Sequence, residues 1–183
     1  MSYSTQNSLL LNKLMKFYKE SNHLDQILPI INGESKISLR LIDWFATNFS
    51  KKNYIVYNIK RKGQIKRFNV YIDYKLKLKA YSKRRFDPFC RWDRITIPYN
   101  DEYQIQTTIG QLNFFKWALE NNIINFIKEN YERIENDMNS RNSTARKKTN
   151  NSKQKTRKKR EELSVSATKS IKTEHVEIVV KFK

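Results

Sequence analysis

The chain has 183 residues and carries 37 lysines and arginines against 18 aspartates and glutamates, which gives a formal net charge of +19 and a pI of about 10.0. Such an excess of positive charge opposes a compact state and is compensated by a polyanion such as a phosphate backbone, so we expect an anionic partner. No segment approaches the roughly 18 consecutive apolar residues of a membrane-spanning helix, the N-terminus lacks a signal-peptide pattern, and a single cysteine excludes an internal disulfide. These features favour a soluble intracellular protein without membrane insertion.

Aromatic residues and charge divide the chain into three parts. All ten tyrosines, all three tryptophans and nine of the ten phenylalanines precede residue 140, so residues 1–139 can bury a core. Residues 140–162 are rich in lysine and arginine and have almost nothing to bury, which predicts a disordered linker. Residues 163–183 form a C-terminal segment that regains strand-like character at 175–182.

The first 53 residues show helical periodicity. Over residues 7–20, Leu10, Leu14, Phe17 and Tyr18 recur at the spacing of an amphipathic helix. Pro29 and Gly33 indicate a break, and a second helix follows with Ser35 or Ser38 as its cap. The apolar face of this second helix consists of Leu41, Ile42, Trp44, Phe45 and Phe49.

After residue 53 the period changes from about 3.6 to 2. Residues 54–59 are β-branched and aromatic, KRKGQ supplies a turn, and apolar residues alternate with polar ones over 68–78. This pattern predicts a β-hairpin with a long second strand. Its outward face would carry a lysine row of Lys75, Lys77 and Lys79.

Residues 81–139 begin with a proline-containing segment and then return to the helical period. Residues 81–94 are basic and aromatic and include Pro88, which predicts an ordered loop, and 95–99 reads as an edge strand ended by Pro98. Thr108 and Gln111 have the form of a capping box, and apolar residues then continue at helical spacing. This predicts one helix bent near residue 121, or two helices joined there.

Together these elements predict an α+β fold, in which a small antiparallel sheet packs with N- and C-terminal helices and a disordered basic tail follows. The strand at 175–182 is not stable alone. It pairs either with the domain's own sheet or with a partner protein, for which a structural or scaffold protein recruited through 174–183 is our candidate.

Three basic clusters form the candidate nucleic-acid site. Residues 51–67 contain no acid, residues 75–94 interleave basic and aromatic side chains, and residues 140–160 contain ten basic residues. Cations dispersed in this way bind phosphates with salt-sensitive affinity, and nearby rings can stack on bases. The predicted binding residues are Lys51, Lys52, Lys60, Arg61, Lys62, Lys66, Arg67, Lys75, Lys77, Lys79, Lys83, Arg84, Arg85, Arg91, Trp92, Arg146, Lys147, Lys148, Lys155, Arg157, Lys158, Lys159 and Arg160.

Other chemistries receive less support. Asp73, Asp87 and Asp93 are candidate metal ligands of a nuclease, but we expect Asp87 and Asp93 to pair with neighbouring arginines instead. Cys90 and the two histidines are too dispersed for a zinc site, and three glycines do not make a phosphate loop. We therefore predict no enzyme activity, no metal and no cofactor. The run KTRKKR at 155–160 also fits a nuclear-targeting signal.

The 107–139 region also fits a helix-turn-helix reading, since its second half carries several asparagines able to meet base edges. Its heavily apolar composition favours core packing instead.

Four segments of the sequence are similar to those of a known protein family: IDWFATNFSKKN at 42–53, VYIDYKLKLKAYSKRRFDPFCRW at 70–92, TIGQLNFFKWALENN at 108–122 and VEIVVKF at 176–182. They resemble a poorly characterised family of short basic proteins of nucleocytoplasmic large DNA viruses, the mimivirus-like giant viruses. The resemblance implies a viral factory in the host cytoplasm, and a virion, as the setting.

We therefore expect a protein that binds nucleic acid mainly by electrostatics and takes part in packaging or organising viral DNA, with DNA favoured over RNA as partner. The alternative is a scaffold protein of a viral assembly or condensate that recruits nucleic acid through its basic tail.

Overall fold

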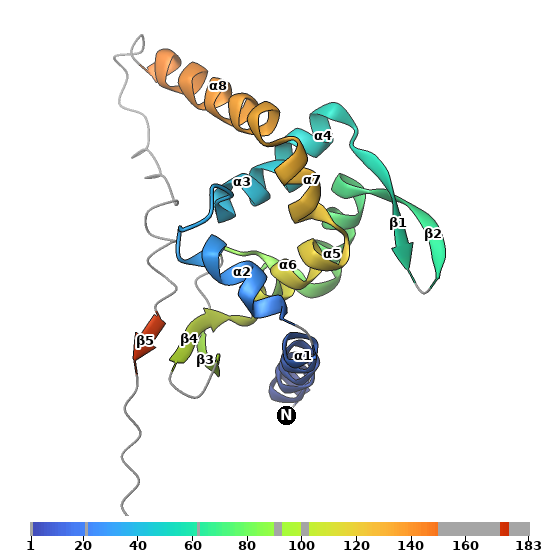
Figure 1. Ribbon diagram of the computed structural model, residues 1–183, viewed down its shortest axis with the longest axis vertical. Helices are drawn as coiled ribbons and strands as arrows, with labels where there is room; N and C mark the ends of the chain where they lie inside the picture. Colours follow the sequence, from blue (N-terminus) through green and yellow to red (C-terminus); the bar gives the residue numbers. More distant parts are fainter. Residues whose placement is uncertain are drawn as a thin grey trace, which may run out of the picture.

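The computed structural model describes the backbone of residues 2–20, 22–61, 63–89, 93–99, 103–149 and 173–175, and the side chains of those residues from 6 to 141 except 103. Within these residues the fold is α+β, as predicted. Helices form the body of the molecule, and two small antiparallel sheets lie at opposite sides of it (Figure 1). The single central sheet of the prediction is thus replaced by two peripheral ones.

The N-terminal third is helical. Its elements are α1 (Ser2–Lys19), α2 (His23–Ile31), α3 (Leu39–Trp44), the π-helical turn η1 (Phe45–Phe49) and α4 (Ser50–Asn53). Ser38 caps α3 as predicted, because its hydroxyl accepts a hydrogen bond from the Leu41 amide at 3.1 Å. The predicted break at Pro29 is wrong, since this proline lies inside α2, and the chain turns at Gly33 with a φ of 78°.

The hairpin is shorter than predicted. Strand β1 (Val56–Arg61) pairs with β2 (Gln64–Asn69), and the chain then enters helix α5 (Val70–Phe86). Asn69 starts this helix by accepting a hydrogen bond from the Ile72 amide at 3.0 Å.

The predicted lysine row on a long second strand is therefore wrong. The helix buries Val70 and Tyr74 and leaves Ile72 and Leu76 exposed, whereas a strand would place all four on one face. On α5, Lys75 and Lys79 are exposed one turn apart, whereas Lys77 is half-buried. The predicted loop at 81–94 is also corrected, since its first six residues belong to α5, which is kinked at Ser82 with a φ of 65°.

The second sheet has the order β3-β4-β5, with β3 (Arg94–Pro98), β4 (Tyr103–Thr108) and β5 (Thr173–His175). Strand β3 is an edge strand, as predicted. Strand β5 pairs antiparallel with β4, with Thr173 opposite Ile105. The C-terminal region thus returns to the chain's own sheet at 173–175, and most of the predicted strand at 175–182 lies outside the described residues.

Three helices complete the body: α6 (Ile109–Glu120), α7 (Ile123–Glu129) and α8 (Tyr131–Thr149). Thr108 caps α6 by accepting a hydrogen bond from the Gln111 amide at 3.2 Å, which confirms the capping prediction. The structure confirms the second alternative, two helices joined near residue 121. At this junction the backbone of Asn122 is left-handed, with a φ of 56°. Helix α8 carries a helical backbone beyond residue 139, and the predicted linker from residue 150 lies outside the described residues.

An aromatic cluster lies between α5 and α6. The rings of Tyr74, Phe86, Phe114 and Trp117 pack with centroids 5.7 to 6.4 Å apart, and Phe86 and Phe114 are fully buried. The two helices approach closely at Gly110, where a Cβ atom would lie 2.9 Å from the Asp87 carbonyl oxygen. In the part of the chain that is described, no helix is both long and apolar enough to span a membrane.

Candidate nucleic-acid interface

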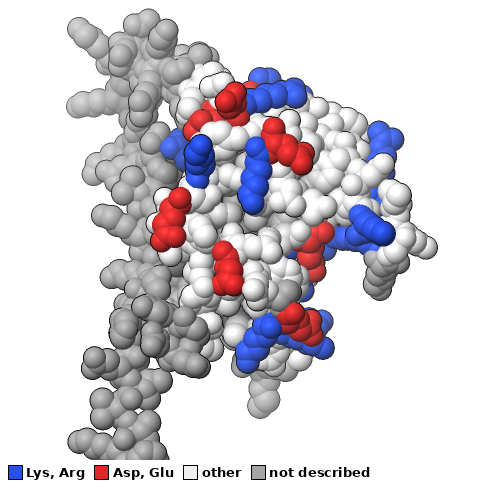
Figure 2. Space-filling model, viewed as in Figure 1, with Lys and Arg blue, Asp and Glu red and all other residues white. Residues whose placement is uncertain are grey.

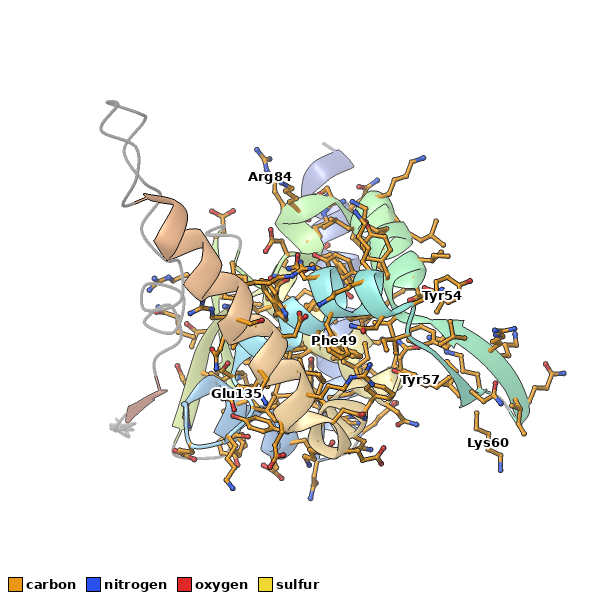
Figure 3. The ribbon with its side chains drawn as sticks, turned by 90° about the horizontal axis from the view of Figure 1, so that it is seen from above. Phe49, Tyr54, Tyr57, Lys60, Arg84 and Glu135 are labelled. Atoms are coloured by element: carbon orange, nitrogen blue, oxygen red, sulfur yellow. The ribbon has the colours of Figure 1, made fainter. Side chains whose placement is uncertain are left out.

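The β1–β2 hairpin extends away from the helical body (Figures 1 and 3). One of its faces is anchored: Ile59 and Phe68 are buried, and the ring of Tyr57 stacks on that of Phe126 of α7 with centroids 5.2 Å apart. The Tyr57 hydroxyl donates to the backbone carbonyl of Asn121, and Arg61 Nη2 donates to the Asn121 side chain at 2.8 Å. The hairpin is thus fixed to the junction of α6 and α7 through Tyr57 and through Arg61, which lies beside the turn.

The other face of the hairpin meets solvent. Cross-strand pairing places Lys60 opposite Ile65 and Asn58 opposite Arg67, and all four side chains are exposed. Directly opposed residues lie on the same side of an antiparallel pair, so these four form one surface, which we call the ribbon face. Lys60 points away from the body in Figure 3.

The hairpin cations have no counter-charge nearby. Within the described side chains, Lys60, Lys66 and Arg67 form neither a salt bridge nor a hydrogen bond, and the sequence contains no acid between Asp43 and Asp73. Their charges are therefore available to an anion from outside the chain. On the face shown in Figure 2, by contrast, basic and acidic side chains are interspersed.

Several predicted site residues serve the fold instead. Lys52 forms a salt bridge with Asp137 at 2.6 Å, and Trp44 Nε1 donates to the same carboxylate at 3.1 Å. Burial opposes ionisation of Asp137, but these two hydrogen bonds outweigh it and hold its pKa below the ordinary value. Arg85 donates to Asn7 and Gln6 of α1. Lys52 and Arg85, like Arg61, thus connect elements of the body.

Helix α5 carries a second cationic surface. Lys75, Lys79 and Lys83 follow one another at four-residue spacing, and none of them has a hydrogen bond or salt bridge among the described side chains. Beside them Ile72 and Leu76 are 50% and 60% exposed. Together with other residues of α5 they line a shallow groove of about 740 Å³, which we call the α5 groove.

The remaining predicted residues contribute less to a defined surface. Lys51 lies over the Tyr71 ring with Nζ 5.7 Å from its centroid, and Arg84 is exposed near the end of α5. Several predicted side chains lie outside the described residues: Lys62, Arg91, Trp92, Arg146, Lys147, Lys148, Lys155, Arg157, Lys158, Lys159 and Arg160.

The alternative sites find other partners. Asp73 accepts a hydrogen bond from Trp117 Nε1 at 2.7 Å, and Asp87 accepts one from the Phe89 amide at 2.9 Å. Among the described side chains, Asp87 forms no ion pair with an arginine. The described residues contain no group of three or more histidine, cysteine or acidic side chains suited to a metal ion. In the helix-turn-helix reading, the recognition helix would be α7, but Ile123, Ile124 and Ile127 are buried, as core packing predicts.

Sequence reasoning missed two members of the ribbon face, Asn58 and Ile65. The turn sequence KRKGQ predicts where the hairpin lies, but only the observed register places Asn58 and Ile65 beside Lys60 and Arg67. A two-residue turn at Lys62–Gly63 would have predicted that register.

Comparison with known proteins places the chain among proteins without an assigned role. A model described as a family of unknown function (DUF7197) matches residues 2–180. The chain belongs to this family. The uncharacterized protein L507 of Acanthamoeba polyphaga mimivirus is 45% identical to it over 135 residues, which cover 70% of this chain and 52% of that protein. The chain therefore spans about half the length of this curated relative, and no solved structure matches it.

The mimivirus relative confirms one part of the resemblance, namely that the chain is similar to a poorly characterised giant-virus protein. The basic character of the family's members stays a prediction.

Proposed function

We propose that this protein is a non-enzymatic nucleic-acid-binding protein that helps to organise or package viral DNA. The observation that carries the proposal is the hairpin, which projects from the body with unpaired Lys60, Lys66 and Arg67. Cations in such a position release counterions when they meet phosphates, which favours binding with little sequence preference.

Duplex DNA is the favoured partner because of the hairpin's shape. A two-stranded β-ribbon can enter either the major or the minor groove of B-form DNA, whereas the major groove of A-form RNA is too deep and narrow for side chains to read. The ten basic residues at 140–160 add further charge to the chain. In this account they strengthen binding to any polyanion, while the hairpin provides the preference for duplex DNA.

The setting follows from the relative's source. A DNA-organising protein of a giant virus would act in the viral factory of the host cytoplasm and be carried in the virion. We keep this as part of the proposal.

Binding of the full chain to duplex DNA, single-stranded DNA and duplex RNA of equal length tests the proposal. We expect the duplex DNA to bind most tightly at about 0.15 M salt. A variant with Lys60, Lys66 and Arg67 changed to Gln should lose this preference and bind all three ligands equally. Absence of DNA binding by the unaltered chain would contradict the proposed function.

A matched control for this variant exchanges three exposed lysines outside the hairpin, Lys13, Lys19 and Lys36, for Gln. It removes the same charge, so any difference between the two variants reports position rather than total charge. We expect the control to keep the preference for duplex DNA.

The α5 groove favours a second candidate, a scaffold protein of a viral assembly. Ile72 and Leu76 gain nothing from phosphate, whereas an acidic amphipathic helix would cover them and place carboxylates near Lys75 and Lys79. A designed peptide with this pattern should bind the full chain, and Leu76→Ser should weaken it about tenfold, since burying a leucine contributes roughly 1.5–3 kcal/mol. Leu9→Ser, at an exposed leucine of α1, is the control.

A further inference from the structure

Ile65 is the most exposed large apolar side chain in the described part of the protein. Its side chain is 74% accessible, compared with 57% for Leu9 and 60% for Leu76. It is the second residue of β2 and pairs with Lys60, one step from the Arg61–Gln64 pair that closes the hairpin. An apolar group therefore lies near the tip of the projecting element, among cations.

The surroundings of Ile65 limit what this side chain can do within the chain. The anchored face of the hairpin, with Ile59 and Phe68, lies on the other side of the ribbon, so Ile65 contributes nothing to the core. Its neighbours on the ribbon face are Lys60 and Arg67, while Lys66 follows it in the sequence. Lys66 lies on the anchored face, because it pairs with Ile59. Any surface that attracts Lys60 and Arg67 also comes into contact with Ile65.

A nucleic acid offers an apolar side chain only two partners. Phosphates and the hydrogen-bonding edges of the bases gain nothing from isoleucine, so contact is favourable only with the stacked faces of bases or with thymine methyl groups. Architectural DNA-binding proteins insert isoleucine, leucine, phenylalanine or methionine between base pairs from the minor groove and kink the duplex. Cations on either side of such a wedge can hold the phosphates that flank the unstacked step.

We propose that Ile65 is an intercalating wedge, which inserts between adjacent base pairs of duplex DNA and bends it while Lys60 and Arg67, on the same face, hold the flanking phosphates. This inference rests on the proposed function and specifies the partner as bendable duplex DNA. The anchoring of the hairpin at Asn121 through Tyr57 and Arg61 supports it, because a wedge transmits force to DNA only if its own support is fixed.

The test uses the full chain and a duplex of about 30 base pairs with a fluorescence donor and acceptor at its ends. We expect binding to raise energy transfer, and to raise the emission of 2-aminopurine placed at the unstacked step. Ile65→Ala should lose most of both signals while weakening binding less than about tenfold, because the cations remain. Ile65→Met should keep both signals, since methionine also serves as a wedge.

Leu9→Ala is the matched control, because it removes another exposed apolar side chain from a different element. It should bend DNA as the unaltered chain does. Thermal unfolding of each variant checks that the fold is unchanged, which we expect for Ile65→Ala because the side chain is exposed.

Three results would overturn the wedge. One is an Ile65→Ala variant that bends DNA as the unaltered chain does, and another is an unaltered chain that binds without bending or unstacking. The third is loss of the Ile65 effect when uracil replaces thymine, which would assign Ile65 to thymine methyl groups instead. Each leaves the proposed function intact, whereas absence of binding by the unaltered chain overturns that function and the wedge with it.

Discussion

Arg61 Nη2 donates a hydrogen bond to Asn121 Oδ1 at 2.8 Å and thereby connects the hairpin to the junction of α6 and α7. Asn121 is fully buried, its Nδ2 donates to the Trp117 carbonyl at 2.7 Å, and its own carbonyl accepts from Tyr57 at 2.7 Å. Asn121 thus joins the end of α6 to both Tyr57 and Arg61 of the hairpin. The orientation of the hairpin depends on this residue more than on any turn residue.

Replacing Asn121 with Ala should lower the free energy of unfolding by about 2–4 kcal/mol, because two side-chain hydrogen bonds are lost in a buried site. Urea denaturation of the full chain measures this. The matched control is Asn125→Ala on the exposed side of α7, which should change the stability by less than about 0.5 kcal/mol. Equal effects of the two changes would show that Asn121 does not have this anchoring role.

The aromatic cluster should dominate the stability of the domain. Phe114 is fully buried against the rings of Phe86 and Trp117, so Phe114→Ala should cost about 3–5 kcal/mol through lost burial and the cavity left behind. Ile72→Ala, at a half-exposed position of α5, should cost far less. If both changes shifted the urea midpoint equally, the core would have to lie elsewhere.

Asp43 should make stability depend on pH. Burial, and next the charge of Asp87, raise the pKa of Asp43 from 3.8 to about 7. Between these values the folded state keeps a proton that the unfolded state has lost, so stability falls as the pH rises from about 4 to 7. Asp43→Asn cannot ionise and should therefore melt several degrees above the unaltered chain at pH 8.

At pH 4 the same two proteins should have similar melting temperatures, because Asp43 is then protonated in the folded state and close to half protonated in the unfolded state, so little of the difference in proton binding has accumulated. Comparing them at each pH cancels the titration of all other groups. A difference that is constant from pH 4 to pH 8 would mean that Asp43 does not titrate as described.

The sequence predicted the elements whose signals are local. The cap of α3 at Ser38, the cap of α6 at Thr108, the turn before β2 and the edge strand β3 all depend on a few neighbouring residues, and all are confirmed. Their physical causes are side-chain hydrogen bonds to free amides and restricted backbone angles, which act within one turn of the chain.

Helix α5 shows where sequence reasoning failed. Phe68, Val70, Ile72, Tyr74, Leu76 and Leu78 alternate as in a strand, but Asn69 starts a helix and the core formed by Phe86, Phe114 and Trp117 decides which face is buried. That packing joins segments far apart in the sequence, so no local pattern could reveal it. The same helix leaves Ile72 and Leu76 exposed, which the strand reading would have buried.

The candidate site shows the same division. Its positive charge could be predicted from composition, because residues 51–67 contain no acid. Which cations remain available could not, since Lys52 and Arg85 find partners in elements distant in the sequence. Among the described side chains, the predicted cations that remain available include Lys60, Lys66 and Arg67 of the hairpin and Lys75, Lys79 and Lys83 of α5.

The salt dependence of DNA binding tests the central claim most directly. For the full chain on a duplex, the slope of log K against log salt concentration equals about −0.9 for each phosphate neutralised. Changing Lys60, Lys66 and Arg67 to Gln should make this slope shallower by about 2–3, whereas the control with Lys13, Lys19 and Lys36 changed to Gln should keep the slope of the unaltered chain. Equal slopes for both triple variants would contradict the account, because the hairpin would then contribute charge but no phosphate contacts.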